Sequence, residues 1–208
     1  MSMCSCPAGA ALPQIPNASC PQDWGQTQKI IFQRIFKTAG TKNSFTQTAS
    51  IKQLSSWTTL FSASDGTKCV ITPYVEAQTS DGGDAITFGG GNDTVGGTTK
   101  VIGRNPVNMS FVMRQMTQDV IKALKGLQCE DELGVYLVNG DGQILAVSTK
   151  DNEYTPIPIR SLFISDLKLM GLDNPDENSL SFSFLPNWSD DVKVVAPEFN
   201  PLTDLSNS

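Results

Sequence analysis

The sequence contains no histidine, and this absence narrows the chemistry that the chain can carry out. Histidine is the side chain used most often as a general base, as a metal ligand and as the partner that activates a serine or cysteine nucleophile. The chain also has no complete metal-ligand or nucleophile motif. We therefore expect a protein that is not an enzyme and that has no catalytic site, no cofactor and no required metal.

Long apolar runs are also missing. No segment approaches the ~18 consecutive apolar residues of a membrane-spanning helix. The first residues, MSMCSCPAGAALPQIP, lack both the basic region and the apolar stretch of a signal peptide. These absences predict a protein without a membrane span that is made and kept in the cytosol.

Positive charge is scarce as well. The chain has 15 Lys and Arg against 21 Asp and Glu, a net charge of −6, and no basic cluster. Sequence-specific nucleic-acid binding requires clustered Lys and Arg that displace phosphate counterions. This class of function is therefore excluded by the composition.

The cysteines do not form a recognisable framework. The chain has five, an odd number, and they are unevenly spaced, which favours reduced thiols over disulfides: Cys4, Cys6, Cys20, Cys69 and Cys129. Cys4, Cys6 and Cys20 could bind a soft metal, but paired C-x-x-C knuckles are missing, and plain thiols are favoured. Cys69 and Cys129 lie next to apolar positions, where we expect buried, unreactive thiols.

The clearest folding signal lies between Asn105 and Thr149. Apolar residues at helical spacing predict a helix over residues 111–127, with a buried face made by Met113, Met116, Val120, Ile121, Leu124 and Leu127. A β-hairpin over residues 133–138 and 144–147 follows, because Asn139-Gly140-Asp141-Gly142 can adopt the positive φ angles of a tight turn. The helix must cover a sheet that other segments complete.

Further strands are predicted over residues 29–36, 68–75, 161–169, 179–185 and 192–196. Pro73 cannot donate to a central ladder, so residues 68–75 should form an edge. Residues 50–60 predict a short helix or turn that packs Trp57 into the core. We expect one buried core made by Met116, Val120, Leu124, Val135, Leu137, Ile144, Phe182 and Phe184.

Long polar segments surround this framework. Only 39% of the residues are hydrophobic, while Gly and Pro are frequent, which predicts loops or arms that pack on a neighbouring subunit. We predict an N-terminal arm over 1–28, a β-sandwich domain over 29–196 and a C-terminal tail over 197–208. In the tail, Phe199, Leu202 and Leu205 are available for docking.

Residues 78–99, QTSDGGDAITFGGGNDTVGGTT, predict a long Gly-rich loop or a flexible hairpin. No Lys follows the glycines in the place that a phosphate-binding P-loop requires. Asp81, Asp84 and Asp93 weakly suggest calcium, but no nonapeptide repeat supports such a site. A structureless loop of this length is uncommon unless it is functional, so it is the best candidate for contacts beyond its own subunit.

The remaining candidates for catalysis are neighbouring carboxylates. A glycosidase would use two of them as acid and base, and Glu130 with Asp131, or Asp190 with Asp191, are the adjacent pairs. Both pairs precede strands, where solvated loop acids are expected, so the structural interpretation is favoured.

The order of these elements resembles a known family. VIGRNPVNMSF, MRQMTQDVIKALKGL, GVYLVNGDGQILAV, SLSFSFLPNW and VVAPEF follow one another as strand, helix, hairpin and closing strands. This order is similar to that of the tail-tube fold of tailed bacteriophages, and the chain as a whole resembles virion proteins of phages infecting Bacteroidetes, including the crAss-like group. The resemblance covers roughly residues 29–200 and implies a mainly β (α+β) fold, a β-sandwich with one principal flanking helix and extended terminal arms.

The resemblance also implies a function. It suggests a structural subunit of the virion that forms a homo-oligomeric ring in the tail or head-to-tail region and docks on tail, portal or capsid proteins, with a lumen that could pass DNA. Such a protein would be assembled in the host cytoplasm. Two alternatives stay open, a surface binding or adhesion module and a capsid accessory protein.

Overall fold

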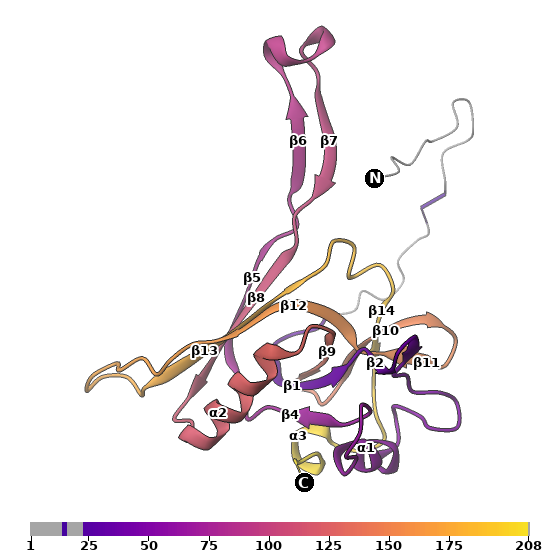
Figure 1. Ribbon diagram of the computed structural model, residues 1–208, viewed down its shortest axis with the longest axis vertical. Helices are drawn as coiled ribbons and strands as arrows, with labels where there is room; N and C mark the ends of the chain where they lie inside the picture. The colour runs from indigo at the N-terminus through magenta and orange to yellow at the C-terminus, as the bar shows by residue number, and fades with distance from the viewer. Residues whose placement is uncertain (1–13, 16–22, 208) are drawn as a thin grey trace.

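Strand β9, Leu133–Asn139, is the element around which the sheet is built in the computed structural model (Figure 1), which describes residues 14–15 and 23–207. All seven of its residues are buried. One side of β9 pairs along its length with β1 (Thr27–Arg34), and the other side pairs with β10 (Ile144–Lys150) and with the start of β12 (Ile157–Ile164). This full burial is typical of a strand covered on both faces.

The sheet divides at β9 into two halves. The first half contains β4 (Cys69–Ile71) beside β1, then β9 and β10, with β11 (Glu153–Thr155) and β14 (Val192–Val195) paired to β10. The second half contains β12, β13 (Glu177–Phe184), β8 (Val107–Arg114) and β5 (Glu76–Gly82) in that order. Two small ladders stand apart, β2 (Phe36–Thr38) with β3 (Thr41–Lys42), and β6 (Ala85–Gly89) with β7 (Thr99–Arg104).

Strand β12 carries the chain from one half to the other. Its first two residues pair with β9, and from Ile159 it pairs with β13. The register shifts between Arg160 and Phe163, where Ser161 has a φ of 55°. Such an irregularity bends a strand and increases its twist. The two halves therefore face one another in a β-sandwich-like arrangement, and the prediction of a mainly β fold is confirmed.

The first core lies between the two halves and is closed by helix α2 (Gln118–Gly126). It contains alternate residues of β1, β9, β12, β13 and β8 together with Leu124 of α2. Phe182 stands at its centre, with ring centroids 5.8 Å from Phe111 and 5.3 Å from Phe184. Contacts of this kind add to the free energy gained by burying the rings.

The second core lies on the opposite face of β1, β9 and β10. It is covered by α1 (Leu54–Phe61), by the segment that carries Phe45 and Ile51, and by a C-terminal segment with the one-turn helix α3 (Pro201–Asp204). Trp57 is fully buried here, 4.5 Å from Phe45 between ring centroids, and its indole N–H donates to the Ile51 carbonyl at 2.8 Å. The prediction that Trp57 is a packing residue is confirmed.

The predicted helix over 111–127 is wrong in its first half. Met109, Phe111 and Met113 are buried on one side of strand β8, which pairs with β13 on one edge and β5 on the other. Alternation at a period of two decides the structure there, and ladder bonds to two neighbours reinforce it. The helix begins only at Gln118, after Gln115 takes a φ of 54°. Helix α1 is nearly as long, so α2 is not the one principal helix.

The predicted single core is also corrected. Val135, Leu137, Leu124, Phe182 and Phe184 are buried together in the first core, with Met116 and Val120 packed against it. Ile144 is buried in the second core instead. It pairs directly with Val138, and directly paired residues lie on the same face of a sheet, so Ile144 faces away from Leu137.

The other strand predictions fare well. Strands overlap the predicted ranges 29–36, 68–75, 133–138, 144–147, 179–185 and 192–196, and β4 is an edge that ends before Pro73. Residues 161–169 are extended only to Ile164, and the connector at 151–160 contains β11 and the start of β12.

The predicted arms lie partly within the body. Most of the arm over 1–28 falls outside the described residues, but Trp24 packs against the first core. The described part of the predicted tail, residues 197–207, packs on the body of its own chain, with Leu205 buried and Phe199 and Leu202 packed against the second core. In the described part of the chain, none of the helices has the length and apolar character needed to cross a membrane.

Candidate functional site

The predicted loop over 78–99 is an ordered β-hairpin that projects from the body (Figure 1). β5 pairs with β8 as far as Gly82 and Val107, and β6 and β7 continue the ribbon outward. At the junction the Asn105 N–H donates to the Asp84 carbonyl at 2.9 Å. At its base Arg104 donates to the Asn187 side chain at 2.9 Å. The sequence predicts either a long loop or a flexible hairpin for this segment, and the structure shows a hairpin.

Two short 3-10 turns, Gly91–Asp93 and Val95–Gly97, form the hairpin tip. The Thr94 hydroxyl accepts from the Gly90 N–H at 3.1 Å and donates to the Thr98 carbonyl at 2.6 Å. Gly89 has a φ of 90°, and a Cβ there would lie 2.1 Å from a methyl carbon of Thr94. Glycine is thus required for this closure rather than for flexibility.

The hairpin exposes apolar side chains on both faces. Ile86 and Phe88 lie on one face, with Phe88 opposite Lys100, and Val101 lies on the other, opposite Thr87. Phe88 is 56% exposed and Val101 63%, and Val95 at the tip is 100% exposed. An isolated two-stranded ribbon is marginally stable in water, and a group of exposed apolar residues marks an interaction surface. The hairpin is therefore suited to lie between two other surfaces.

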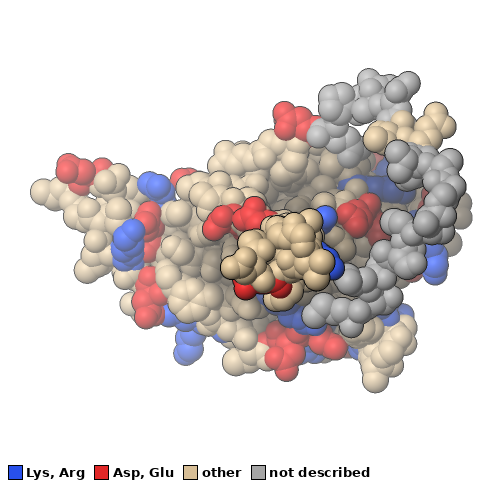
Figure 2. All heavy atoms as spheres, turned by 90° about the horizontal axis from the view of Figure 1, so that it is seen from above, with Lys and Arg blue, Asp and Glu red and all other residues tan. Residues whose placement is uncertain are grey.

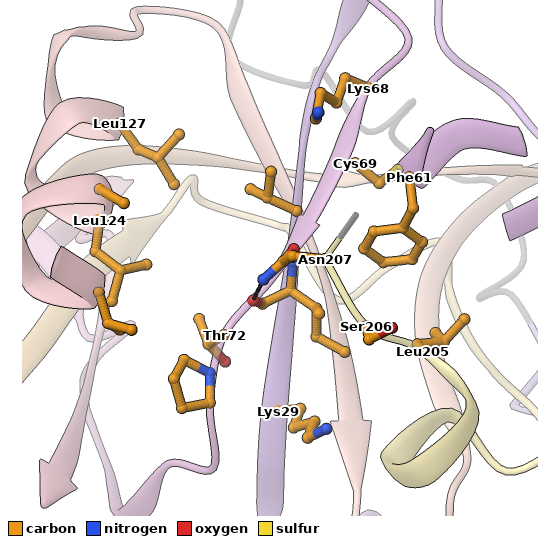
Figure 3. Close-up of a pocket in the computed structure, with 15 residues that line it drawn as sticks. Lys29, Phe61, Lys68, Cys69, Thr72, Leu124, Leu127, Leu205, Ser206 and Asn207 are labelled. Atoms are coloured by element: carbon orange, nitrogen blue, oxygen red, sulfur yellow. Dashed lines mark hydrogen bonds between the residues drawn. The ribbon is translucent and has the colours of Figure 1, made fainter. Parts of the chain in front are cut away.

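A groove borders the free edge of β4 (Figure 3). Its volume is about 500 Å³, and it is lined by β4, by α2 and by the chain around Leu205 and Asn207. The Asn207 side chain accepts from the Ile71 N–H at 2.8 Å and donates to the Ile71 carbonyl at 2.7 Å. A single amide thus satisfies both outward backbone groups of Ile71, in the manner of a neighbouring strand.

Two lysines flank this groove. Lys29 is half-buried and its ammonium group donates to the Leu202 carbonyl at 2.7 Å, while it lies 4.8 Å from the centre of the Tyr74 ring. Burial lowers the pKa of Lys29 because it disfavours the charged form. Lys68 is exposed, and no carboxylate belongs to the residues that line the cavity.

Charge is mixed on the face that carries the hairpin. Figure 2 shows Lys and Arg interspersed with Asp and Glu on the face seen from above, on which the hairpin tip points toward the viewer. An interspersed surface does not provide the continuous basic stripe that a phosphate backbone requires.

The adjacent acidic residues are held in two ways, Glu130 through its carboxylate and Asp131 and Asp191 through their backbone carbonyls. Arg34 donates to both oxygens of Glu130, at 2.6 and 2.8 Å, and these hydrogen bonds hold the pKa of Glu130 below its usual value. The Asp131 carbonyl accepts from Arg160 at 2.6 Å, and the Asp191 carbonyl accepts from the Ser148 N–H at 2.8 Å. These contacts fix loops to strands.

The thiols differ in their surroundings. Cys69 is buried, and burial raises the pKa of its thiol well above the usual value, so it is protonated and unreactive. Cys129 is exposed, so its predicted burial is wrong. It follows α2 in a 3-10 turn (Leu127–Cys129) that leaves its side chain outside the first core. Cys4, Cys6 and Cys20 lie outside the described residues.

Across residues 14–15 and 23–207, no three His, Cys, Asp or Glu side chains are grouped so as to hold a metal ion. Asp81, Asp84 and Asp93 are spread along the hairpin, in β5, at the junction and at the tip. No sequence signal pointed to the groove, because its key contact joins Ile71 to Asn207 across the length of the chain.

Comparison of the sequence with known protein families gives no match, and comparison with curated proteins gives none either. Among solved structures, one match is to a chain described as "Virion of native gene transfer agent (GTA) particle". The TM-score is 0.31 at 11% sequence identity, over 58% of this chain and 82% of that chain.

Proposed function

We propose that this protein is a non-enzymatic structural subunit of a phage particle, one that forms a homo-oligomeric ring in the tail or head-to-tail region and docks on other virion proteins. The observation that carries the proposal is the projecting hairpin with apolar side chains exposed on both of its faces. The weak similarity to a virion chain is not what the proposal rests on.

Ordering the hairpin has a cost that the isolated chain does not recover. Each ordered residue loses about 1–2 kcal/mol of backbone conformational free energy. Burial of apolar area returns about 25 cal/mol per Å², but Phe88, Val101 and Val95 remain exposed in the single chain. Insertion of the hairpin between two neighbouring subunits would bury both faces and supply the free energy of apolar burial that the single chain lacks.

The body supports the same proposal. Edge strand β4 and the exposed edge of the hairpin are surfaces that a neighbouring chain can extend, and a closed ring leaves no such edge free. The partners are then other copies of this chain and other tail, portal or capsid proteins, without sequence-specific nucleic-acid binding, although a lumen could pass DNA. The location is the virion tail region, reached by assembly in the host cytoplasm.

Removal of the hairpin tests the proposal. Replacing residues 85–104 by Asn-Gly joins Asp84 to Asn105, which are already linked by a hydrogen bond, and leaves the β5–β8 ladder intact. We expect the variant to keep its circular dichroism spectrum and to remain monomeric in sedimentation velocity, while the parent forms rings in electron micrographs. Equal assembly of variant and parent would refute the role of the hairpin.

A matched pair of variants separates apolar contact from mere presence of the ribbon. Ile86→Ser with Phe88→Ser removes the large apolar side chains of one hairpin face. Thr87→Ser with Thr99→Ser changes the same strands and leaves every Ile, Phe and Val in place. Only the first pair should weaken assembly. A parent chain that stays monomeric at all concentrations would instead favour the alternative of a binding or adhesion module that presents the hairpin to a ligand.

A further inference from the structure

The loop between β12 and β13 carries a second set of exposed apolar side chains. Leu167, Leu169 and Leu172 are all more than half exposed. Lys168 between them forms a two-way backbone pair with Glu177, at 2.8 and 3.1 Å. In a strand, successive residues direct their backbone groups to opposite edges. Leu167 and Leu169 therefore direct theirs outward, and within the described residues these groups make no hydrogen bond.

Strand β4 offers the complementary edge. The Thr72 N–H donates inward to the Ile30 carbonyl at 2.9 Å, so Cys69 and Ile71 direct their backbone groups outward into the groove. Ile71 is occupied by the Asn207 side chain, which an incoming strand would replace (Figure 3). The apolar side chains of α2 that line the groove are Val120, Ala123, Leu124 and Leu127.

We propose, on the basis of the homo-oligomer proposed above, that residues 167–169 of one copy add as a strand to β4 of the next copy. The incoming strand runs parallel to β4, so that the backbone groups of Leu167 and Leu169 pair with Cys69 and Ile71 while both side chains lie on the Val70 face and extend the apolar surface of α2. Charge complementarity supports a second copy as the occupant. The groove is flanked by Lys29 and Lys68 and has no acidic lining residue. The incoming loop, residues 166–177, carries four acidic residues, Asp173 among them, against the single cation Lys168, which is already paired with Glu177 at 3.1 Å.

The placement of the two edges makes the contact head to tail. In Figure 1 helix α2 lies between the β12–β13 loop and β4, and Lys125 of α2 binds Asp166 at the root of the loop. The loop thus points away from the groove of its own subunit. A contact between two different patches repeats from copy to copy and closes into a ring where the rotation allows.

Cross-linking tests this pairing directly. In a background where Cys4, Cys6, Cys20 and Cys129 are serine, a chain that carries both Leu169→Cys and Ala123→Cys should give a ladder of disulfide-linked oligomers on mild oxidation. Each single variant, and Ala123→Cys combined with Leu185→Cys at another exposed position, should give no ladder. Absence of a ladder from a chain that still forms rings would overturn this inference and leave the ring proposal standing.

Two further variants sharpen the test. Lys68→Glu should weaken association about 2- to 5-fold, the range expected for an exposed ion pair, and Asp173→Lys in the same chain should restore it. Asn207→Ala frees the backbone N–H and C=O of Ile71 for an incoming strand and should therefore strengthen association. If the Asn207 contact only stabilises the edge of its own subunit, association should not become stronger. Sedimentation equilibrium measures all three. A parent chain that is monomeric throughout would overturn both proposals, while intact rings that these changes do not affect would overturn only this one.

Discussion

Strand β9 and the β6–β7 hairpin are both ribbons with apolar side chains on two faces, yet their surroundings are opposite. In β9, residues facing either way are buried, because the first core covers one face and the second core covers the other. In the hairpin, Phe88 and Val101 face opposite ways and both are exposed. A ribbon with two apolar faces buries both of them only between two layers. The body of the chain supplies both layers for β9, whereas the hairpin must obtain them from neighbouring subunits.

The largest expected effect concerns the second core. Trp57→Ala should lower the free energy of unfolding by about 3–5 kcal/mol, because it leaves a cavity among Phe45, Phe61 and Tyr136 and removes the indole hydrogen bond. Urea unfolding followed by circular dichroism measures this loss. A loss no larger than that of an exposed residue such as Leu54→Ala would show that the second face of β9 is not packed.

A smaller loss is expected where helix α2 meets the first core. Leu124→Ala should cost about 2–5 kcal/mol, toward the lower end because Leu124 also borders the open groove. Val120→Ala, which removes a half-buried side chain from the same helix, serves as the comparison and should cost less. Equal losses for the two would mean that α2 does not close the core through Leu124.

The surface pair of Arg34 and Glu130 should contribute less than about 1 kcal/mol, since both side chains are partly exposed. Arg34 lowers the pKa of Glu130 in the folded state, so the contribution is present above the unfolded pKa of about 4.3 and is lost as the pH falls through the folded value. The stability of the parent should therefore fall more than that of Arg34→Gln between pH 6 and 3. Parallel curves would contradict this assignment.

The smallest effect on stability is expected in the hairpin. Phe88→Ser, measured where the chain is monomeric, should change the free energy of unfolding by no more than about 0.5 kcal/mol, because the ring contributes little burial to the single chain. Thermal melts at several protein concentrations would reveal the contrast with Trp57. A loss comparable to that of Trp57→Ala would mean that the hairpin packs on its own body.

Much of the body could be predicted because its strands alternate legibly. Leu180, Phe182 and Phe184 are separated by serines, and Asn139-Gly140 marks the turn of the β9–β10 hairpin. The prediction of a helix from residue 111 is wrong at its start because Met113 fits both a period of two through Phe111 and a period of 3.6 through Met116. Only the pairing of β8 with two neighbours distinguishes them.

The second core and the groove gave weaker signals. Phe45, Ile51 and Trp57 are scattered among polar residues, so no periodicity shows that they cover a sheet. The contact of Asn207 with Ile71 depends on tertiary structure alone. The Gly-rich segment suggested contacts beyond the subunit, but its few apolar residues did not reveal an ordered ribbon with two exposed faces.

The pairing of β1 with β9 has a consequence for how the chain is made. Thr27 pairs with Asn139, more than 100 residues further along the chain. At a synthesis rate of roughly 5–20 residues per second, β1 must wait about 5–20 s for its partner, while the local β5–β8 ribbon can already form. Long-range pairings of this kind also fold slowly. During that interval the apolar run Ile30-Ile31-Phe32 stays uncovered, so we expect the yield of soluble protein to rise when chaperones are supplied in excess and to fall when translation is slowed.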